Sequence, residues 1–231
     1  MAKNLSERFS DVKNQIELAA EKAGRNADEI KLVAVSKTHP AEILLEAIEA
    51  GANILGENKV QEAESKIEEI GREKAEWHLI GHLQKNKARK AVKLFDWIHT
   101  IDSRELAERL ERICIEENRT DLNVLIQVDL ANETTKSGVA ENDLPELINY
   151  LKSCEILKLK GLMIMPPYFE DAEKTRPFFK NLREIRDRFL PNGELSMGMS
   201  HDFSVAIEEG ATIIRVGTAI FGERNYNSAK S

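Results

Sequence analysis

Residues Leu32-Val33-Ala34-Val35-Ser36-Lys37 form an almost uninterrupted apolar run that ends in a lysine, and a helical pattern follows at once from Thr38-His39-Pro40. A short apolar run before a helix is typical of a buried strand. An amine held against apolar walls loses solvation of its charged form, so its pKa falls and the neutral nucleophile becomes available. Lys37 is therefore a candidate for Schiff-base formation. The alternative is a strand-end lysine that only reaches for solvent.

The same strand-then-helix pattern recurs along the rest of the chain. Such alternation is typical of a parallel sheet with crossover helices. The predicted strands are Lys31–Ser36, Asn53–Leu55, Trp77–Ile80, Trp97–Ile101, Val124–Val128, Leu159–Met165, Leu195–Met199 and Thr212–Val216. Eight such units predict an α/β fold of the (β/α)8 TIM barrel class, and 231 residues suit one domain of this kind, covering residues 1–231.

The first residues predict an amphipathic helix over residues 4–23 that packs on the barrel. Leu5, Phe9, Val12 and Ile16 recur at helical spacing, and acidic residues are interspersed among them. Acidic residues do not suit a signal or transit peptide, and no apolar window approaches the about 18 residues of a membrane span. We therefore expect a cytoplasmic protein without a membrane partner.

Composition narrows the possible partners. The net charge of -7 argues against binding to nucleic acid, which calls for a positive surface. The basic run from Lys85 to Lys90 is interpreted as a solvated helix face. Cys114 and Cys154 each lie in an apolar stretch, which favours reduced core thiols over a disulfide.

The predicted barrel brings chemistry-bearing residues to one end. Active sites of such barrels lie at the C-terminal ends of the strands, with phosphate sites after strands seven and eight. Ser200 and the Gly217-Thr218 pair follow those two strands, and unpaired amides at a helix start suit a phosphate. The other residues at this end are Lys37, Glu57, Asn58, Gly81, His82, Asp102, Asp129, Met165, Pro166 and Arg215.

A phosphate site facing an amine suggests a ligand that carries both a phosphate and an aldehyde, and pyridoxal 5′-phosphate (PLP) is one. Ser200, Gly217 and Thr218 would hold its phosphate, and Lys37 would form the imine. Arg215 lies on the strand that leads to Gly217 and could contact the ring nitrogen. Because arginine only donates hydrogen bonds, it would keep that nitrogen unprotonated and the ring a poor electron sink.

Several motifs then occur together in order: Val33-Ala34-Val35-Ser36-Lys37-Thr38, Gly56-Glu57-Asn58, Trp77-His78-Leu79-Ile80-Gly81-His82-Leu83-Gln84, Lys136-Ser137-Gly138, Gly161-Leu162-Met163, Ser196-Met197-Gly198-Met199-Ser200 and Arg215-Val216-Gly217-Thr218-Ala219-Ile220-Phe221-Gly222. From about Lys31 to Gly222 the chain resembles the pyridoxal phosphate homeostasis protein family.

The resemblance implies a barrel like the N-terminal domain of alanine racemase. It also implies PLP held by Lys37, with Ser200, Gly217 and Thr218 on the phosphate and Arg215 on the ring nitrogen. The implied role is intracellular PLP (vitamin B6) homeostasis or supply, with little or no turnover, and PLP-dependent apoenzymes as possible partners of a monomer. Asn58, His82 and Met165 are candidates for contact with the ring.

Other functions stay open. A small PLP-dependent racemase needs a second acid or base, which racemases supply from an added domain. Only 14 residues follow Gly217, which leaves no room for such a domain and argues against racemisation. Tyr168 is the only tyrosine predicted near the strand ends. A Schiff-base sugar-phosphate aldolase and an interaction module are the further alternatives.

Two weaker patterns remain. His78 and His82 have a spacing that suits metal only on a helix, so no metal site is expected. Residues 132–138 are interpreted as a mobile loop over the barrel mouth, although ordinary loop chemistry explains them equally well.

Overall fold

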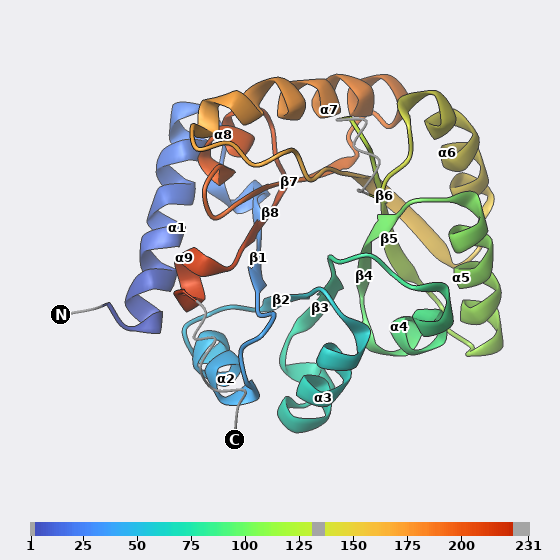
Figure 1. The fold of residues 1–231 in the computed structure, drawn as a ribbon, viewed down its shortest axis with the longest axis horizontal. Helices are drawn as coiled ribbons and strands as arrows, with labels where there is room; N and C mark the ends of the chain where they lie inside the picture. Colours follow the sequence, from blue (N-terminus) through green and yellow to red (C-terminus); the bar gives the residue numbers. More distant parts are fainter. Residues whose placement is uncertain (1–2, 131–136, 224–231) are drawn as a thin grey trace.

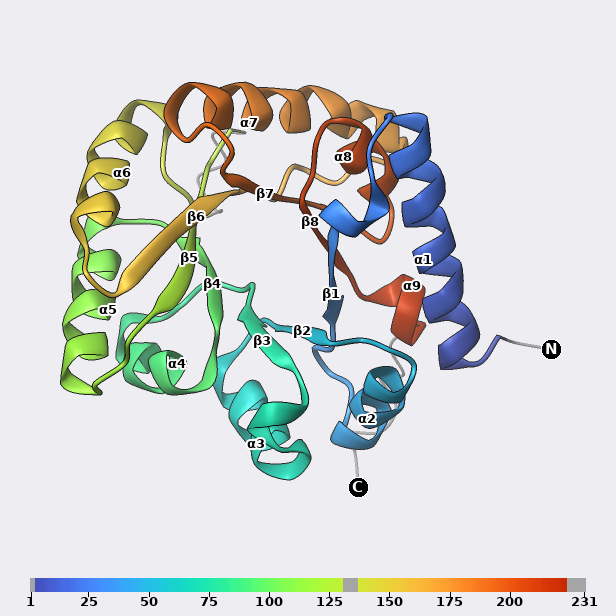
Figure 2. The same ribbon diagram turned by 180° about the vertical axis from the view of Figure 1, so that it is seen from behind.

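The protein forms a closed barrel of parallel strands. The computed structural model describes residues 3–130 and 137–223. In this part of the chain the strands pair in sequence order from β1 to β8, and β8 pairs with β1 to close the ring. Figures 1 and 2 show the strands at the centre and the helices around them. The predicted (β/α)8 TIM barrel is confirmed.

Each predicted strand is present, with ends shifted by at most two residues. The strands are β1 (Lys31–Val35), β2 (Ile54–Glu57), β3 (Glu76–Leu79), β4 (Trp97–Ile101), β5 (Leu122–Gln127), β6 (Leu157–Met163), β7 (Glu194–Met199) and β8 (Ile213–Val216). Met165, predicted as the end of a strand, lies two residues beyond β6 because pairing with β7 stops at Met163.

Helices follow the strands and cover the outside of the barrel (Figure 1). They are α2 (Ala41–Glu49), α3 (Val60–Ile70), α4 (Ala88–Leu94), α5 (Arg104–Glu116), α6 (Leu144–Ser153), α7 (Arg176–Phe189), α8 (Phe203–Glu208) and α9 (Thr218–Phe221). Before β1 comes α1 (Leu5–Lys22), which lies against α8 and α9.

Local sequence explains where the helices start and stop. Asn4 Oδ1 accepts from Glu7 N at 2.8 Å and Asn4 N donates to Glu7 Oε2 at 2.9 Å, a reciprocal capping box at the start of α1. Ser103 Oγ accepts from Leu106 N at 3.3 Å, so Ser103 rather than Asp102 caps α5. Gly51 ends the α2 turn with φ +104°, a conformation that side chains disfavour.

The apolar core has two layers. The larger layer lies between the strands and the surrounding helices. A smaller cluster contains Val33, Val35, Leu125, Met163 and Ile213, which alternate along their strands with residues of the outer layer and therefore fill the barrel interior. The interior thus has an apolar wall close to the end of β1.

One glycine is required where β7 meets its helix. At Gly198, φ is +93° and a Cβ would lie 2.6 Å from Ala206 Cβ. Because α8 packs this closely on β7, a side chain at position 198 would displace the segment that leads to Ser200.

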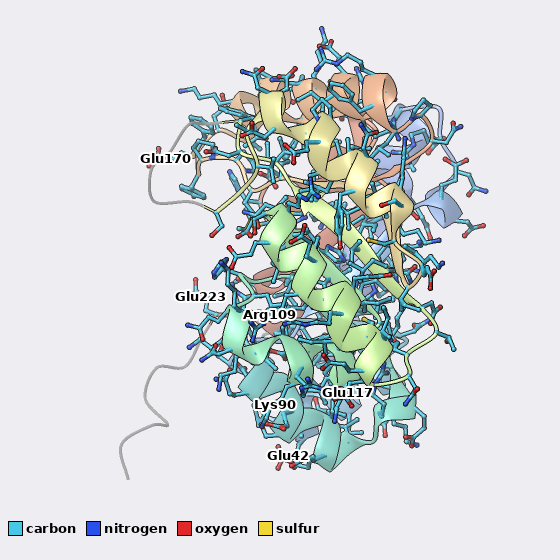
Figure 3. All side chains as sticks on the ribbon, turned by 90° about the vertical axis from the view of Figure 1, so that its right-hand side faces the viewer. Glu42, Lys90, Arg109, Glu117, Glu170 and Glu223 are labelled. Atoms are coloured by element: carbon cyan, nitrogen blue, oxygen red, sulfur yellow. The ribbon has the colours of Figure 1, made fainter. Side chains whose placement is uncertain are left out.

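Charged side chains cover the outer helices (Figure 3). The basic run pairs with acidic side chains of neighbouring helices: Lys85 Nζ lies 2.5 Å from Glu105 Oε2, and Lys90 Nζ lies 2.6 Å from Glu64 Oε2. Exposed pairs of this kind contribute at most about 1 kcal/mol each. Across residues 3–130 and 137–223, no helix combines the length and apolar character that a membrane crossing requires.

Candidate functional site

Three neighbouring strands bring the predicted site residues to the same end of the barrel. β8 lies between β7 and β1, with Arg215 in register with Met199 on one side and Val33 on the other. Ser200 follows β7 directly, and Gly217 follows β8 directly. Lys37 lies two residues beyond β1 and is half-buried.

The Ser200 hydroxyl is joined to the start of α9. Its Oγ accepts from Gly217 N at 3.1 Å and from Ala219 N at 3.4 Å, while Thr218 is the exposed first residue of the helix. A Cβ at Gly217 would lie 3.3 Å from the Val35 carbonyl oxygen, so glycine lets β8 approach β1 closely here. A hydroxyl and two amide groups therefore converge, and this donor set suits a phosphate.

Arg215 is buried inside the barrel. Its Nη1 donates to Ser196 Oγ at 2.6 Å and its Nη2 donates to the Ile164 carbonyl at 2.9 Å. Burial lowers the pKa of Arg215 to about 10, with the Asp202 carboxylate acting in the opposite direction. A pKa near 10 still leaves the guanidinium charged at neutral pH, so Arg215 can only donate hydrogen bonds.

A buried ion pair holds the loop that carries Lys37. Lys66 Nζ donates to Glu57 Oε1 at 2.6 Å, to Glu62 Oε1 at 2.7 Å and to the Ser36 carbonyl at 2.8 Å. Ser36 Oγ also donates to Glu57 Oε1, at 2.6 Å. Burial raises the pKa of Glu57, although Lys66 opposes the shift. These contacts fix the residue directly before Lys37.

The residue directly after Lys37 is strained. Thr38 has φ +68°, in the left-handed region that a β-branched residue rarely adopts. Its backbone N–H donates to Glu62 Oε1, the carboxylate oxygen that Lys66 also binds. His39 then stacks on Phe221 of α9 with ring centroids 4.9 Å apart. The loop is therefore tied to α3 on one side and, on the other, to the end of α9, the helix that begins at the phosphate-type site.

The three residues predicted to contact the ring lie in two places. Asn58 and His82 line one open pocket of about 620 Å³ between the ends of β2 and β3. His82 Nδ1 lies 3.2 Å from Asp102 Oδ2 and 3.1 Å from Ser137 Oγ. Met165 packs against the interior apolar cluster instead. Their contact with a ring stays a prediction.

Several features of the site were missed by the sequence patterns. Lys66 lies among glutamates on α3, a pattern typical of a solvent-exposed helix face, yet its side chain is 7% exposed. His99 and Ser196 are fully buried within strands, next to Arg215. A polar residue at an inward position of an apolar strand was the only available signal for both.

The weaker interpretations have mixed outcomes. Tyr168 is 76% exposed, with its ring 5.7 Å from that of His201. His78 is buried in the barrel while the His82 side chain is 54% exposed, and the described ranges contain no cluster of three or more His, Cys, Asp or Glu suited to a metal. Most of the proposed mobile loop, residues 132–136 of 132–138, lies outside the described residues.

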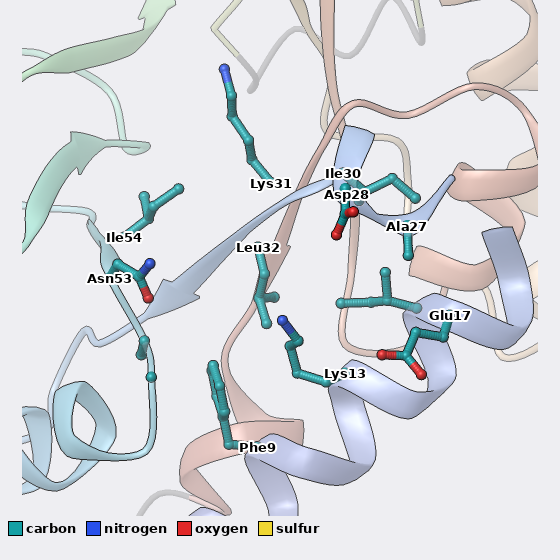
Figure 4. Close-up of a pocket in the computed structure, with 13 residues that line it drawn as sticks. Phe9, Lys13, Glu17, Ala27, Asp28, Ile30, Lys31, Leu32, Asn53 and Ile54 are labelled. Carbon is teal, nitrogen blue, oxygen red and sulfur yellow. The ribbon is translucent and has the colours of Figure 1, made fainter. Parts of the chain in front are cut away.

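A separate pocket of about 230 Å³ lies at the opposite end of β1 (Figure 4). Phe9, Lys13 and Glu17 of α1 lie across it from Leu32 and the start of β2, while the Lys31 side chain extends away from the helix. Because Lys31 begins β1 and Lys37 follows its end, the two lysines belong to opposite mouths of the barrel.

The closed parallel barrel, with a lysine past its first strand and converging amides past its last, defines a (β/α)8 barrel of the alanine racemase type. The family described as alanine racemase, N-terminal domain, matches residues 9–225. Alanine racemase from Corynebacterium glutamicum superposes with a TM-score of 0.65 at 17% identity, covering 95% of this chain and 62% of that one, which supports the fold alone.

Two nearer relatives identify the family more narrowly. The pyridoxal phosphate homeostasis protein of Aquifex aeolicus is 44% identical over 230 residues, covering 96% of this chain and 100% of that protein. PipY of Synechococcus elongatus, solved with PLP bound, superposes with a TM-score of 0.83 at 39% identity, covering 95% and 100% of the two chains. The chain therefore belongs to the pyridoxal phosphate homeostasis protein family, and the resemblance noted in its motifs is confirmed.

Proposed function

We propose that this chain binds PLP and takes part in its intracellular homeostasis or supply. The observation that carries the proposal is the contact of Ser200 Oγ with Gly217 N, at 3.1 Å, beside the strand that leads to Lys37. A phosphate-type donor set and a lysine thus share one barrel mouth. The PLP-bound structure of PipY, a relative at 39% identity, supports the same ligand here.

The residues present fit PLP in their chemistry. Ser200 and the amides after β8, together with Thr218, would hold the phosphate, and Lys37 would hold the aldehyde carbon as a Schiff base with loss of one water. PLP when bound would supply an aldehyde and an electron-withdrawing ring. Arg215 would donate to the ring nitrogen and keep it unprotonated, which disfavours chemistry through a long-lived carbanion.

The remaining roles follow from the placement of the other residues. Met165 packs against the interior apolar cluster, where it would contact the ring, while Asn58 and His82 would approach from the β2 and β3 ends. We further infer that residues 1–231 form one PLP-binding domain, that the protein is a cytoplasmic monomer, that turnover is marginal, and that PLP-dependent apoenzymes receive the cofactor.

The test is the visible absorbance of the purified protein with added PLP, before and after borohydride reduction, followed by peptide mapping. A yellow band that reduction fixes covalently to Lys37 is expected, and Lys37→Ala should abolish the fixation. Lys31→Ala is the matched control, because Lys31 begins β1 at the mouth opposite the one that carries Lys37. A protein that stays colourless with PLP would overturn the proposal.

The same samples separate the alternatives. Turnover of an amino acid between its enantiomers that Lys37→Ala abolishes would indicate a racemase. Cleavage of a sugar phosphate without any bound chromophore would indicate a Schiff-base aldolase. Transfer to an apoenzyme is measured by mixing the PLP-loaded protein with a PLP-free enzyme and following the recovered activity.

A further inference from the structure

A chain of hydrogen bonds runs through the barrel from its N-terminal mouth to Arg215. Glu76 Oε1 lies 2.8 Å from His78 Nε2, and His78 Nδ1 lies 2.9 Å from His99 Nε2. His99 Nδ1 lies 3.0 Å from Ser196 Oγ, which accepts from Arg215 at 2.6 Å. Strands β3, β4, β7 and β8 each contribute to it.

Burial of the polar side chains in this hydrogen-bond chain costs free energy. His78, His99 and Ser196 are fully buried, and Arg215 is 3% exposed. Apolar residues usually fill the interior of such a barrel, and well-packed apolar side chains are often as stabilising as buried polar groups. Trp97 stacks on His78 at a centroid distance of 5.3 Å, so the chain passes through an otherwise apolar interior. Packing therefore gives no reason for two histidines and a serine here.

The two ends of the hydrogen-bond chain set its direction when both histidines are neutral. Arg215 only donates and the Glu76 carboxylate only accepts, so Ser196 Oγ accepts from Arg215 and gives its own proton to His99 Nδ1. His99 then donates from Nε2 to His78 Nδ1, and His78 donates from Nε2 to the Glu76 carboxylate. Both imidazoles must be neutral with the proton on Nε2 for this pattern to hold.

The surroundings of the two histidines favour the neutral form. Burial lowers the pKa of His99 well below its usual range, and His78, Arg215 and Lys31 act in the same direction. Burial also lowers the pKa of His78, against the opposing effect of Glu76. Burial thus favours the neutral, Nε2-protonated form of both histidines, which the first test below measures.

We propose that His78 and His99 are positioning residues which, through Ser196, hold the Arg215 guanidinium in place for the ring nitrogen of bound PLP. The inference rests on the proposed function. Ser196 and the Ile164 carbonyl restrain the two terminal nitrogens of Arg215 in a fixed plane. A planar donor restrained in this way loses less freedom on binding a ligand acceptor.

The first test needs no cofactor. Long-range proton–nitrogen NMR spectra of the ¹⁵N-labelled, PLP-free protein should show His78 and His99 neutral, each with its proton on Nε2. Assignment uses the signals lost in His78→Gln and His99→Gln. A charged His99, or a proton on its Nδ1, would contradict this hydrogen-bond pattern and overturn the inference.

The second test uses PLP affinity and the absorbance of bound PLP. Ser196→Ala and His99→Gln should weaken PLP binding roughly tenfold, the loss expected for one hydrogen bond to a charged group. His99→Asn, which keeps an acceptor near the Nδ1 position, should bind within about threefold of wild type by the same scale. A purely structural role would lower the melting temperature of all three variants without this difference in affinity.

An analogue with carbon in place of the ring nitrogen localises the effect. This analogue has no acceptor for Arg215, so the Ser196→Ala variant should bind it with the same affinity as the wild type does. If the wild type binds PLP and all three variants bind it equally well, this inference fails and the proposed function stands. If the wild type binds no PLP, the proposed function fails and this inference fails with it.

Discussion

Lys66 Nζ lies 2.6 Å from Glu57 Oε1, and their side chains are 7% and 0% exposed. The pair joins α3 to the end of β2, next to the segment that carries Lys37. Because a buried charge without its partner is destabilising, each side chain requires the other. The pair therefore restrains the loop after β1, and removal of one partner should lower the free energy of unfolding.

Lys66→Met should lower the free energy of unfolding by about 3 kcal/mol at neutral pH, since it leaves Glu57 buried without a cation. The loss should shrink in acid. Glu57 has a raised pKa in the folded state, so its stability contribution is present below its unfolded pKa and is lost as pH rises through the folded value. Urea unfolding measures both effects. The Glu57→Gln, Lys66→Met double variant should recover most of the stability, and a single variant as stable as wild type would contradict the role of the pair.

Thr38→Gly should stabilise the protein by about 1 kcal/mol, because glycine adopts the left-handed conformation without strain. Thr38 is exposed, so little packing is lost. Asn192→Gly is the matched control, since Asn192 is also exposed and has the same φ of +68°. Asparagine tolerates this region, so its gain should be smaller. Equal melting temperatures for the two variants would argue against strain beside Lys37.

Stability should fall as the solution is acidified below about pH 6.5, the ordinary pKa of histidine. His78 and His99 have lowered pKa values when folded, so the unfolded chain binds more protons across this window and the free energy of unfolding rises with pH. Each group contributes up to about 1.4 kcal/mol per pH unit. The charged groups that face them are Glu76, Asp96, Lys31 and Arg215.

Urea unfolding between about pH 7.5 and about pH 5 tests this pH dependence. His99→Gln removes one of the two titrating groups. The slope of its unfolding free energy against pH should therefore be smaller than that of wild type by up to about 1.4 kcal/mol per pH unit, the value for one proton. A wild-type unfolding free energy that does not change across this range would show that the buried histidines are not neutral.

Ser200→Ala should weaken PLP binding about tenfold, since the hydroxyl that converges with Gly217 N and Ala219 N is lost. Pyridoxal without phosphate is the control ligand, and its affinity should not change. Fluorescence titration of both ligands gives the comparison. An equal loss for the two ligands would indicate a general disturbance of the barrel mouth rather than a phosphate contact.

The sequence alone determined the order of the elements. Alternating apolar runs and helical patterns predicted each strand, because strand and helix periodicities arise from neighbours in the chain. The placement of Lys37, Ser200 and Gly217 at one end followed from the rule that parallel strands present their C-terminal ends together. The end of β6 was misplaced because pairing with β7, a distant partner, decides it.

Only the tertiary structure decided which polar groups meet. Glu57 and Lys66 come from a strand and the helix that follows it, while His99 and Ser196 are 97 positions apart. Their hydrogen bonds depend on closure of the barrel, which brings inward-facing residues of β4 and β7 to the same level. Local pattern carries no information on such contacts, because it specifies the face of a strand that a residue occupies and not the side chain that it meets across the interior.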